Sequence, residues 1–133
     1  MVFADSSGFI AAFDRRDARH AEAAATWREI ATARRRLVTT QLVLAETVTY
    51  LRRRGGFDLA RRVGRAILES RNIDVVGLDE EAFAAAWREF IRNPEPKLSL
   101  CDAASFVVMR ERGLRHAFTL DHHFESAGFA VQP

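Results

Sequence analysis

Short β-type runs alternate with amphipathic helical segments along this chain, and this alternation constrains the fold more than any other feature. The β-type runs occupy residues 1–4, 37–39, 73–78, 116–120 and 129–131. Apolar residues recur at helical spacing over residues 8–13, 18–36, 41–54, 57–71, 80–91 and 100–112. Strands that are connected through helices pair in parallel. We therefore expect a three-layer α/β/α sandwich around a central, mainly parallel sheet of four to five short strands.

Breaker and capping residues mark the ends of these segments. Gly55-Gly56 is expected to stop the helix that begins near residue 41, and Asp79 is expected to cap the helix that follows it. A proline-containing loop is predicted at 93–96, and residues 121–125 are expected to form a turn. The chain has 133 residues, no internal repeat and no linker, so we predict a single domain over residues 1–133.

The sequence shows no feature of an exported or membrane-bound protein. Residues 1–13 lack the basic start of a signal peptide, and no apolar run approaches the ~20 residues that a membrane span needs. The single cysteine, Cys101, excludes an internal disulfide and is typical of a reducing compartment. We therefore expect a cytoplasmic protein that does not bind a membrane.

Arginine dominates the basic residues and is unevenly distributed. Of the 20 basic residues only Lys97 is not Arg, and residues 1–72 carry a net charge of +6 against −4 for residues 73–133. Because Arg binds phosphate through two hydrogen bonds, we hypothesise that Arg52 to Arg54 help to hold RNA. Two alternative explanations stay open. The genome could use Arg in place of Lys throughout, and the arginines at 52–54, like those at 34–36, could stabilise the C-terminus of a helix.

Several acidic residues stand where apolar strands end or helices begin. Asp5 and Asp121 follow two predicted strands, and ligands of open α/β sheets bind beyond the carboxyl ends of the strands. Each acid also has a structural interpretation, because Asp5 could cap the first helix and Asp121 could be a turn residue. For Asp79 the structural interpretation is favoured more strongly, because Glu80 and Glu81 follow it at the start of a helix.

Two further acids, Glu46 and Asp102, lie in apolar helical segments. A carboxylate that is buried in such a segment must be paired, hydrogen-bonded or bound to a metal. Mg²⁺ and Mn²⁺ take oxygen ligands, and such an ion activates water and neutralises charge during phosphodiester hydrolysis. A bound metal would also allow several neighbouring carboxylates to stay ionised. The acids together therefore suggest metal-assisted phosphodiester hydrolysis.

Four motifs in the chain resemble a PIN-domain ribonuclease and, more narrowly, the VapC toxins of bacterial toxin–antitoxin pairs. They are Val2-Phe3-Ala4-Asp5-Ser6-Ser7, Leu44-Ala45-Glu46, Leu98-Ser99-Leu100-Cys101-Asp102-Ala103-Ala104-Ser105 and Thr119-Leu120-Asp121-His122-His123-Phe124-Glu125-Ser126-Ala127-Gly128-Phe129. The motifs occur in family order and span the whole chain.

This resemblance implies a Mg²⁺- or Mn²⁺-dependent endoribonuclease whose substrate is RNA. The catalytic acids that it implies are Asp5, Glu46, Asp102 and Asp121, and the metal ligands among them are Asp5, Asp102 and Asp121. It also implies that Thr119 is a hydrogen-bonding partner of the site. The partners that it implies are a small cognate antitoxin and a second copy of the chain in a homodimer.

The main alternative is a non-catalytic PIN-type module that binds RNA or protein, but such a module would not need four acids.

The pair His122-His123 has no cysteine or histidine partner at zinc-site spacing, so we expect these side chains to contact solvent or phosphate. Cys101 is expected in the core rather than as a nucleophile. The sequence leaves open which RNA is cut and how many metal ions take part.

Overall fold

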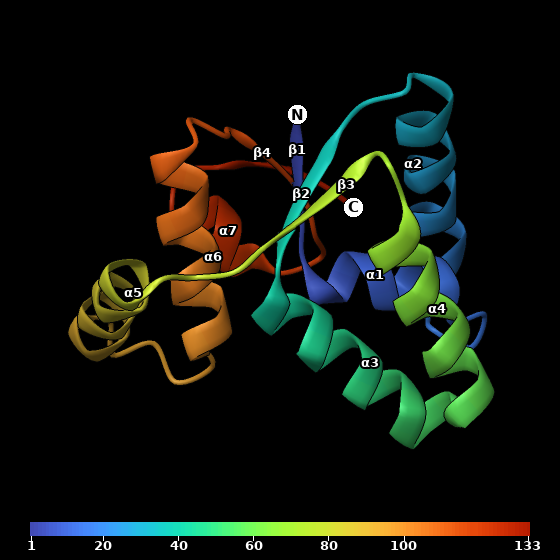
Figure 1. The fold of residues 1–133 in the computed structure, drawn as a ribbon, viewed down its shortest axis with the longest axis horizontal. Helices are drawn as coiled ribbons and strands as arrows, with labels where there is room; N and C mark the ends of the chain where they lie inside the picture. Colours follow the sequence, from blue (N-terminus) through green and yellow to red (C-terminus); the bar gives the residue numbers. More distant parts are fainter.

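A computed structural model describes residues 1–133, and its five strands form one sheet in the order β3-β2-β1-β4-β5 (Figure 1). The strands are β1 (Val2–Ala4), β2 (Leu37–Thr40), β3 (Ile73–Val76), β4 (His116–Phe118) and β5 (Ala130–Gln132). Every adjacent pair is parallel, and Phe3 of β1 lies opposite both Val38 of β2 and Ala117 of β4. The predicted parallel sheet is therefore confirmed.

Seven helices connect the strands and cover the sheet. They are α1 (Ser6–Phe13), α2 (His20–Thr32), α3 (Gln41–Gly55), α4 (Phe57–Glu69), α5 (Glu80–Arg92), α6 (Leu100–Glu111) and α7 (His122–Ser126). Figure 1 shows α1, α2 and α4 on one side of the sheet, α6 and α7 on the other, and α5 outside α6. This arrangement is the expected α/β/α sandwich. None of the helices combines the length and the apolar character that crossing a membrane requires.

Two segments differ from the sequence-based expectation. The helix predicted for residues 18–36 ends at Thr32, and Arg34 beyond it adopts a left-handed φ of 51°. The arginines at 34–36 therefore lie beyond the helix, and its last turn contains no basic residue. The segment 121–125, expected to be a turn, contains most of α7, with Asp121 as the N-cap. A helix of five residues is too short for apolar periodicity to reveal it.

Close packing holds the start of α1 against the end of β4. The backbone N–H of Asp5 donates to the carbonyl oxygen of Phe118 at 3.1 Å. A Cβ atom added to Gly8 would lie only 2.6 Å from that same carbonyl oxygen, so the approach requires glycine. On the sheet itself, Phe3 is fully buried and stacks on Phe124 of α7, with ring centroids 6.2 Å apart. The residues after β1 and β4 are thereby brought side by side.

Candidate active site

The carboxyl ends of the parallel strands meet at one edge of the sheet, and four acids gather there. Asp5 follows β1, Glu46 is on α3 directly after β2, Asp102 lies in the first turn of α6, and Asp121 comes after β4. All four line one open cleft of about 400 Å³. The structure therefore brings together every acid that the sequence predicted for the site.

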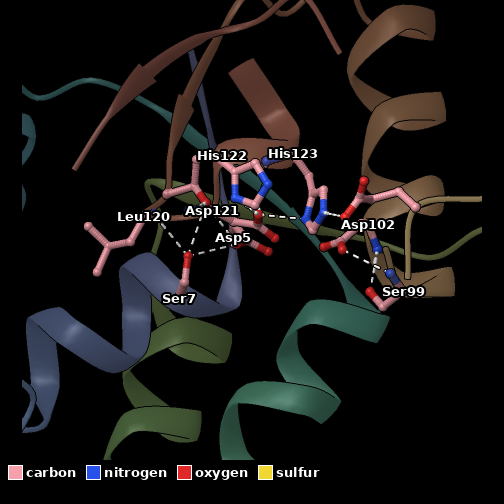
Figure 2. A network of polar contacts seen from close by, with 10 residues as sticks. Asp5, Ser7, Ser99, Asp102, Leu120, Asp121, His122 and His123 are labelled. Atoms are coloured by element: carbon pink, nitrogen blue, oxygen red, sulfur yellow. Dashed lines mark hydrogen bonds and ion pairs between the residues drawn. The ribbon is translucent and has the colours of Figure 1, made fainter. Parts of the chain in front are cut away.

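Asp5 is the most deeply buried of these acids, with 2 % of its surface exposed. Its Oδ2 accepts hydrogen bonds from the hydroxyl of Ser7 (Figure 2) and from the hydroxyl of Thr119, each at 2.9 Å. Its Oδ1 is buried and has no hydrogen-bond partner. Asp5 occupies the N-cap position of α1, as one interpretation expected, but its side chain makes no capping hydrogen bond and is directed to the hydroxyls of Ser7 and Thr119 instead. A buried carboxylate oxygen without a donor is a suitable ligand for a cation.

The electrostatics of the cleft also fit a cation. Burial raises the pKa of Asp5 from 3.8 to about 6, and the neighbouring carboxylate of Asp102 adds to this increase. Burial likewise raises the pKa of Asp102, and the negative charges of Asp121 and Glu46 contribute. A divalent cation would offset both the desolvation and the repulsion, because its charge favours the ionised carboxylates.

A capping box at the start of α6 positions Asp102. The backbone N–H of Asp102 donates to Ser99 Oγ at 2.9 Å, and Asp102 Oδ2 accepts from the Ser99 backbone N–H at 3.0 Å. Figure 2 shows this pair beside Asp5. The reciprocal bonds orient the buried Asp102 carboxylate and occupy only its Oδ2. The other carboxylate oxygen, Oδ1, stays available to bind a cation.

Hydroxyl groups connect Asp5 to the segment that carries Asp121. Thr119 Oγ1, which donates to Asp5, also accepts from the backbone N–H of Asp121 at 3.0 Å. Ser7 Oγ accepts from the backbone N–H of Leu120 at 2.9 Å. Thr119 is thus the hydrogen-bonding partner that the family resemblance implied. The result is a rigid link between the end of β1 and the loop after β4.

Glu46 reaches the cleft in a different way from the other acids, because its side chain is exposed rather than buried. The buried positions of α3 are Val43, Thr47 and Leu51, and Glu46 lines the cleft together with Tyr50. Glu46 Oε1 accepts a hydrogen bond from the hydroxyl of Ser6, the first residue of α1. That hydrogen bond, and not burial in an apolar helix, holds the Glu46 carboxylate in place.

Ser6 and Ser7 were not identified from the sequence as site residues, whereas the structure shows their hydroxyls bonded to the site carboxylates of Glu46 and Asp5. Two hydroxyl residues directly after an acid at a strand end are the signal that could have revealed this role. Lys97 was also missed as a site residue. It is the only lysine of the chain and the only basic residue that lines the cleft. Asp17 lines the cleft as well, and no local pattern marks it.

Cys101 and the histidine pair lie beside the acids. Burial, and then the negative charges of Glu46 and Asp5, raise the pKa of the Cys101 thiol, and this favours its protonated, less reactive form. His122 is exposed, in agreement with the expected contact with solvent. His123, in contrast, is buried.

Comparisons with known proteins agree with this geometry. A family model described as the PIN domain matches residues 2–130. Over 134 aligned residues the chain is 36 % identical to the 23S rRNA-specific endonuclease VapC20 of Mycobacterium tuberculosis, strains CDC 1551 and H37Rv, covering 100 % of this chain and 99 % of the relative. The crystal structure of M. tuberculosis VapC20, described as a sarcin-ricin loop cleaving toxin, matches with a TM-score of 0.90 and 34 % identity over 100 % of both chains. This chain therefore belongs to the PIN-domain family, as a VapC-type endoribonuclease.

Proposed function

We propose that residues 1–133 form a single PIN domain that cleaves RNA with Mg²⁺ or Mn²⁺ held by Asp5, Asp102 and Asp121, and that Glu46 is the fourth catalytic acid. The convergence of these four acids in one cleft, around the unpartnered Oδ1 of Asp5, is the observation that carries this proposal. PIN nucleases in general use a divalent metal. Carboxylate oxygens are the ligands that Mg²⁺ and Mn²⁺ prefer, which supports these two ions.

When bound, the cation would supply Lewis acidity, activating water and neutralising charge on the phosphate. The chain's own contribution is to hold the carboxylates in place before RNA arrives. Two hydroxyls orient Asp5 and a capping box orients Asp102, so little reorganisation is needed during the reaction. Glu46, which is exposed to the cleft and oriented by Ser6, is suited to accept a proton from the attacking water.

Positive charge around the cleft supports a phosphate-containing substrate. The N-termini of α1, α3 and α6 lie at the carboxyl edge of the sheet, and helix N-termini favour anions. Lys97 adds a full positive charge within the cleft. Arg54 lies over the ring of Tyr50, 5.7 Å from its centroid, and Tyr50 lines the cleft. We infer that the RNA backbone extends from the cleft along α3 to Arg52–Arg54, none of which forms an ion pair.

The relatives support a more specific substrate and a protein partner. VapC20 is described as a 23S rRNA-specific endonuclease and as a toxin that cleaves the sarcin-ricin loop. On this basis we propose that the present chain also cuts a ribosomal RNA loop and that a small antitoxin blocks its cleft. The proposed homodimer is supported by an apolar stripe on α5, where Phe83, Trp87 and Ile91 are 43 %, 49 % and 60 % exposed.

Cleavage of purified ribosomal RNA, mapped by primer extension, tests the proposed function. The wild type with Mg²⁺ is compared with Asp5→Asn, with a sample in EDTA, and with Asp79→Asn as a matched acid-to-amide control. Asp79 lies outside the cleft and caps α5 by accepting from the Ala82 N–H at 2.8 Å. We expect a discrete cut by the wild type and by Asp79→Asn, and none by Asp5→Asn or in EDTA.

Each result separates one part of the proposal from another. Cutting by Asp5→Asn at the wild-type rate would refute the assigned site. Metal-dependent cutting of other RNAs, with ribosomal RNA left intact, would support the proposed nuclease activity and refute ribosomal RNA as its substrate. A monomeric mass in light scattering would refute the homodimer without affecting the other conclusions.

A further inference from the structure

A second group of side chains that could hold a metal ion lies next to the acidic cleft, and one of its members, His123, also lies close to Asp102 and Asp121. It consists of Glu95, in the loop between α5 and α6, together with His122 and His123 of α7. One ligand atom from each of these residues lies within 4.8 Å of the other two. The three side chains come from two segments that are distant in sequence, so their convergence is a product of the fold.

His123 is the buried member of the group, with 7 % of its surface exposed. Both ring nitrogens are buried and lack a hydrogen-bond partner. Nε2 lies 3.7 Å from a carboxylate oxygen of Glu95, and Nδ1 lies 2.7 Å from Asp121 Oδ1 without hydrogen-bonding geometry. Because a buried polar atom without a partner costs free energy, the unpartnered Nε2 points to a ligand on the Glu95 side.

His122 and Glu95 form the accessible side of the group. The His122 ring packs on that of His123 with centroids 4.3 Å apart, as Figure 2 shows. Glu95 is exposed, and its backbone N–H donates to Asn93 Oδ1 at 3.1 Å within the loop. These two exposed side chains lie between solvent and the buried Nε2 of His123, so their movement alone would give an ion access to it.

The donor set indicates which cation would bind. Two imidazole nitrogens and one carboxylate oxygen are typical ligands of Zn²⁺, which commonly takes three protein ligands and one water. Mg²⁺ selects oxygen ligands and holds its waters tightly, so it is poorly matched to this group. Local spacing in the sequence argued against zinc at His122-His123 because no cysteine or histidine partner stands at zinc-site spacing. The fold supplies that third ligand as Glu95.

We propose that Glu95, His122 and His123 bind one transition-metal ion of the Zn²⁺ class at a site adjacent to the acidic cleft. The bound ion would join the loop before α6 to α7. That loop leads into the capping box of Asp102, and His123 contacts Asp121, so the ion would brace both segments that carry these acids. The proposal does not depend on RNA cleavage, because metal binding alone tests it.

Calorimetric titration of the full chain with Zn²⁺, in saturating Mg²⁺ and with Asp5→Asn as the background, tests the site. We expect one Zn²⁺ per chain, and a loss of affinity of about tenfold or more for either Glu95→Gln or His122→Gln. Both residues are exposed, so these substitutions leave the core intact. The matched controls, Glu125→Gln on α7 and His116→Gln on β4, are also exposed and should leave the affinity unchanged.

Co²⁺ provides a spectroscopic readout of the same site. Nitrogen-containing, four-coordinate Co²⁺ absorbs strongly in the visible range, and this band should be present in the background chain and lost in Glu95→Gln and His122→Gln. Zn²⁺ binding that is equal in all variants, or that Mg²⁺ displaces, would place the ion in the acidic cleft and overturn the proposal. Absence of Zn²⁺ binding would overturn it as well.

Discussion

Replacing Asp5 with Asn should stabilise the metal-free protein at neutral pH, although it removes a proposed metal ligand. Asp5 is 2 % exposed, and its Oδ1 has no hydrogen-bond partner. The asparagine carbonyl oxygen can still accept from Ser7 and Thr119. The uncharged amide group then occupies the place of the unpartnered Oδ1. The substitution therefore removes the cost of a buried negative charge and retains the hydroxyl contacts.

The pKa of Asp5 determines the size and the pH dependence of this effect. Burial raises the pKa from 3.8 in the free residue to about 6 in the folded protein. A shift of about two units corresponds to roughly 3 kcal/mol in the free energy of unfolding, or roughly 10 °C in Tm for a domain of this size. Because the folded-state pKa is the higher one, the ionised carboxyl opposes folding. The penalty is absent below the unfolded pKa, grows as pH rises between the two values, and is complete above about 6.

Thermal unfolding in EDTA, at about pH 4 and about pH 7.5, measures this difference. The stability difference between the Asn variant and the wild type should be small at the acidic pH, which is close to the unfolded pKa of 3.8, and should reach its full size in favour of the variant at the neutral pH. Asp14→Asn is the matched control: Asp14 is buried too, but its hydrogen bond from Arg16 lowers its pKa, so that variant should lose stability at neutral pH. Added Mg²⁺ should raise the Tm of the wild type and of Asp14→Asn, which keep the proposed metal ligands, but not that of Asp5→Asn. A wild type that is the more stable protein in EDTA at neutral pH would refute the reasoning.

Three further substitutions probe the scaffold and the RNA surface. Gly8→Ala should lower the free energy of unfolding by about 1–3 kcal/mol, because its Cβ would meet the Phe118 carbonyl oxygen at 2.6 Å; an unchanged Tm would contradict that close approach. Ser99→Ala should cost about 1 kcal/mol and weaken Mg²⁺ binding, because the capping box orients Asp102; unchanged Mg²⁺ affinity in calorimetry would argue against this positioning role. The triple Ala variant of Arg52–Arg54 should bind RNA more weakly and with a smaller salt dependence in filter binding, and unchanged RNA affinity would remove these arginines from the RNA surface.

The fold class followed from the sequence because apolar periodicity reports which side chains must be buried. Val2-Phe3-Ala4 is a continuous apolar run, and all three residues are fully buried in the central strand, as expected for a parallel sheet covered on both faces. The strand order and the bounds of short elements depend instead on contacts between distant segments. The end of α2 at Thr32 and the short helix α7 were missed for that reason.

The acids of the site were identifiable from the sequence because strand ends and family motifs mark them. The manner in which each acid is held was not identifiable in this way. Glu46 proved to be exposed and bonded to Ser6, a residue 40 positions earlier in the chain. Asp5 accepts a hydrogen bond from the hydroxyl of Thr119, a residue 114 positions later in the chain. No local pattern records such pairs.

The sequence by itself thus determined which residue types stand at the carboxyl edge of a parallel sheet, and with them the class of chemistry. Only the tertiary structure decided which of their atoms lack partners. The free Oδ1 of Asp5 and the unpartnered nitrogens of His123 are examples. The physical reason is that hydrogen bonding and burial arise between segments far apart in the chain, such as the loop carrying Glu95 and helix α7. Local spacing encodes the elements themselves, whereas the packing of those elements creates the sites between them.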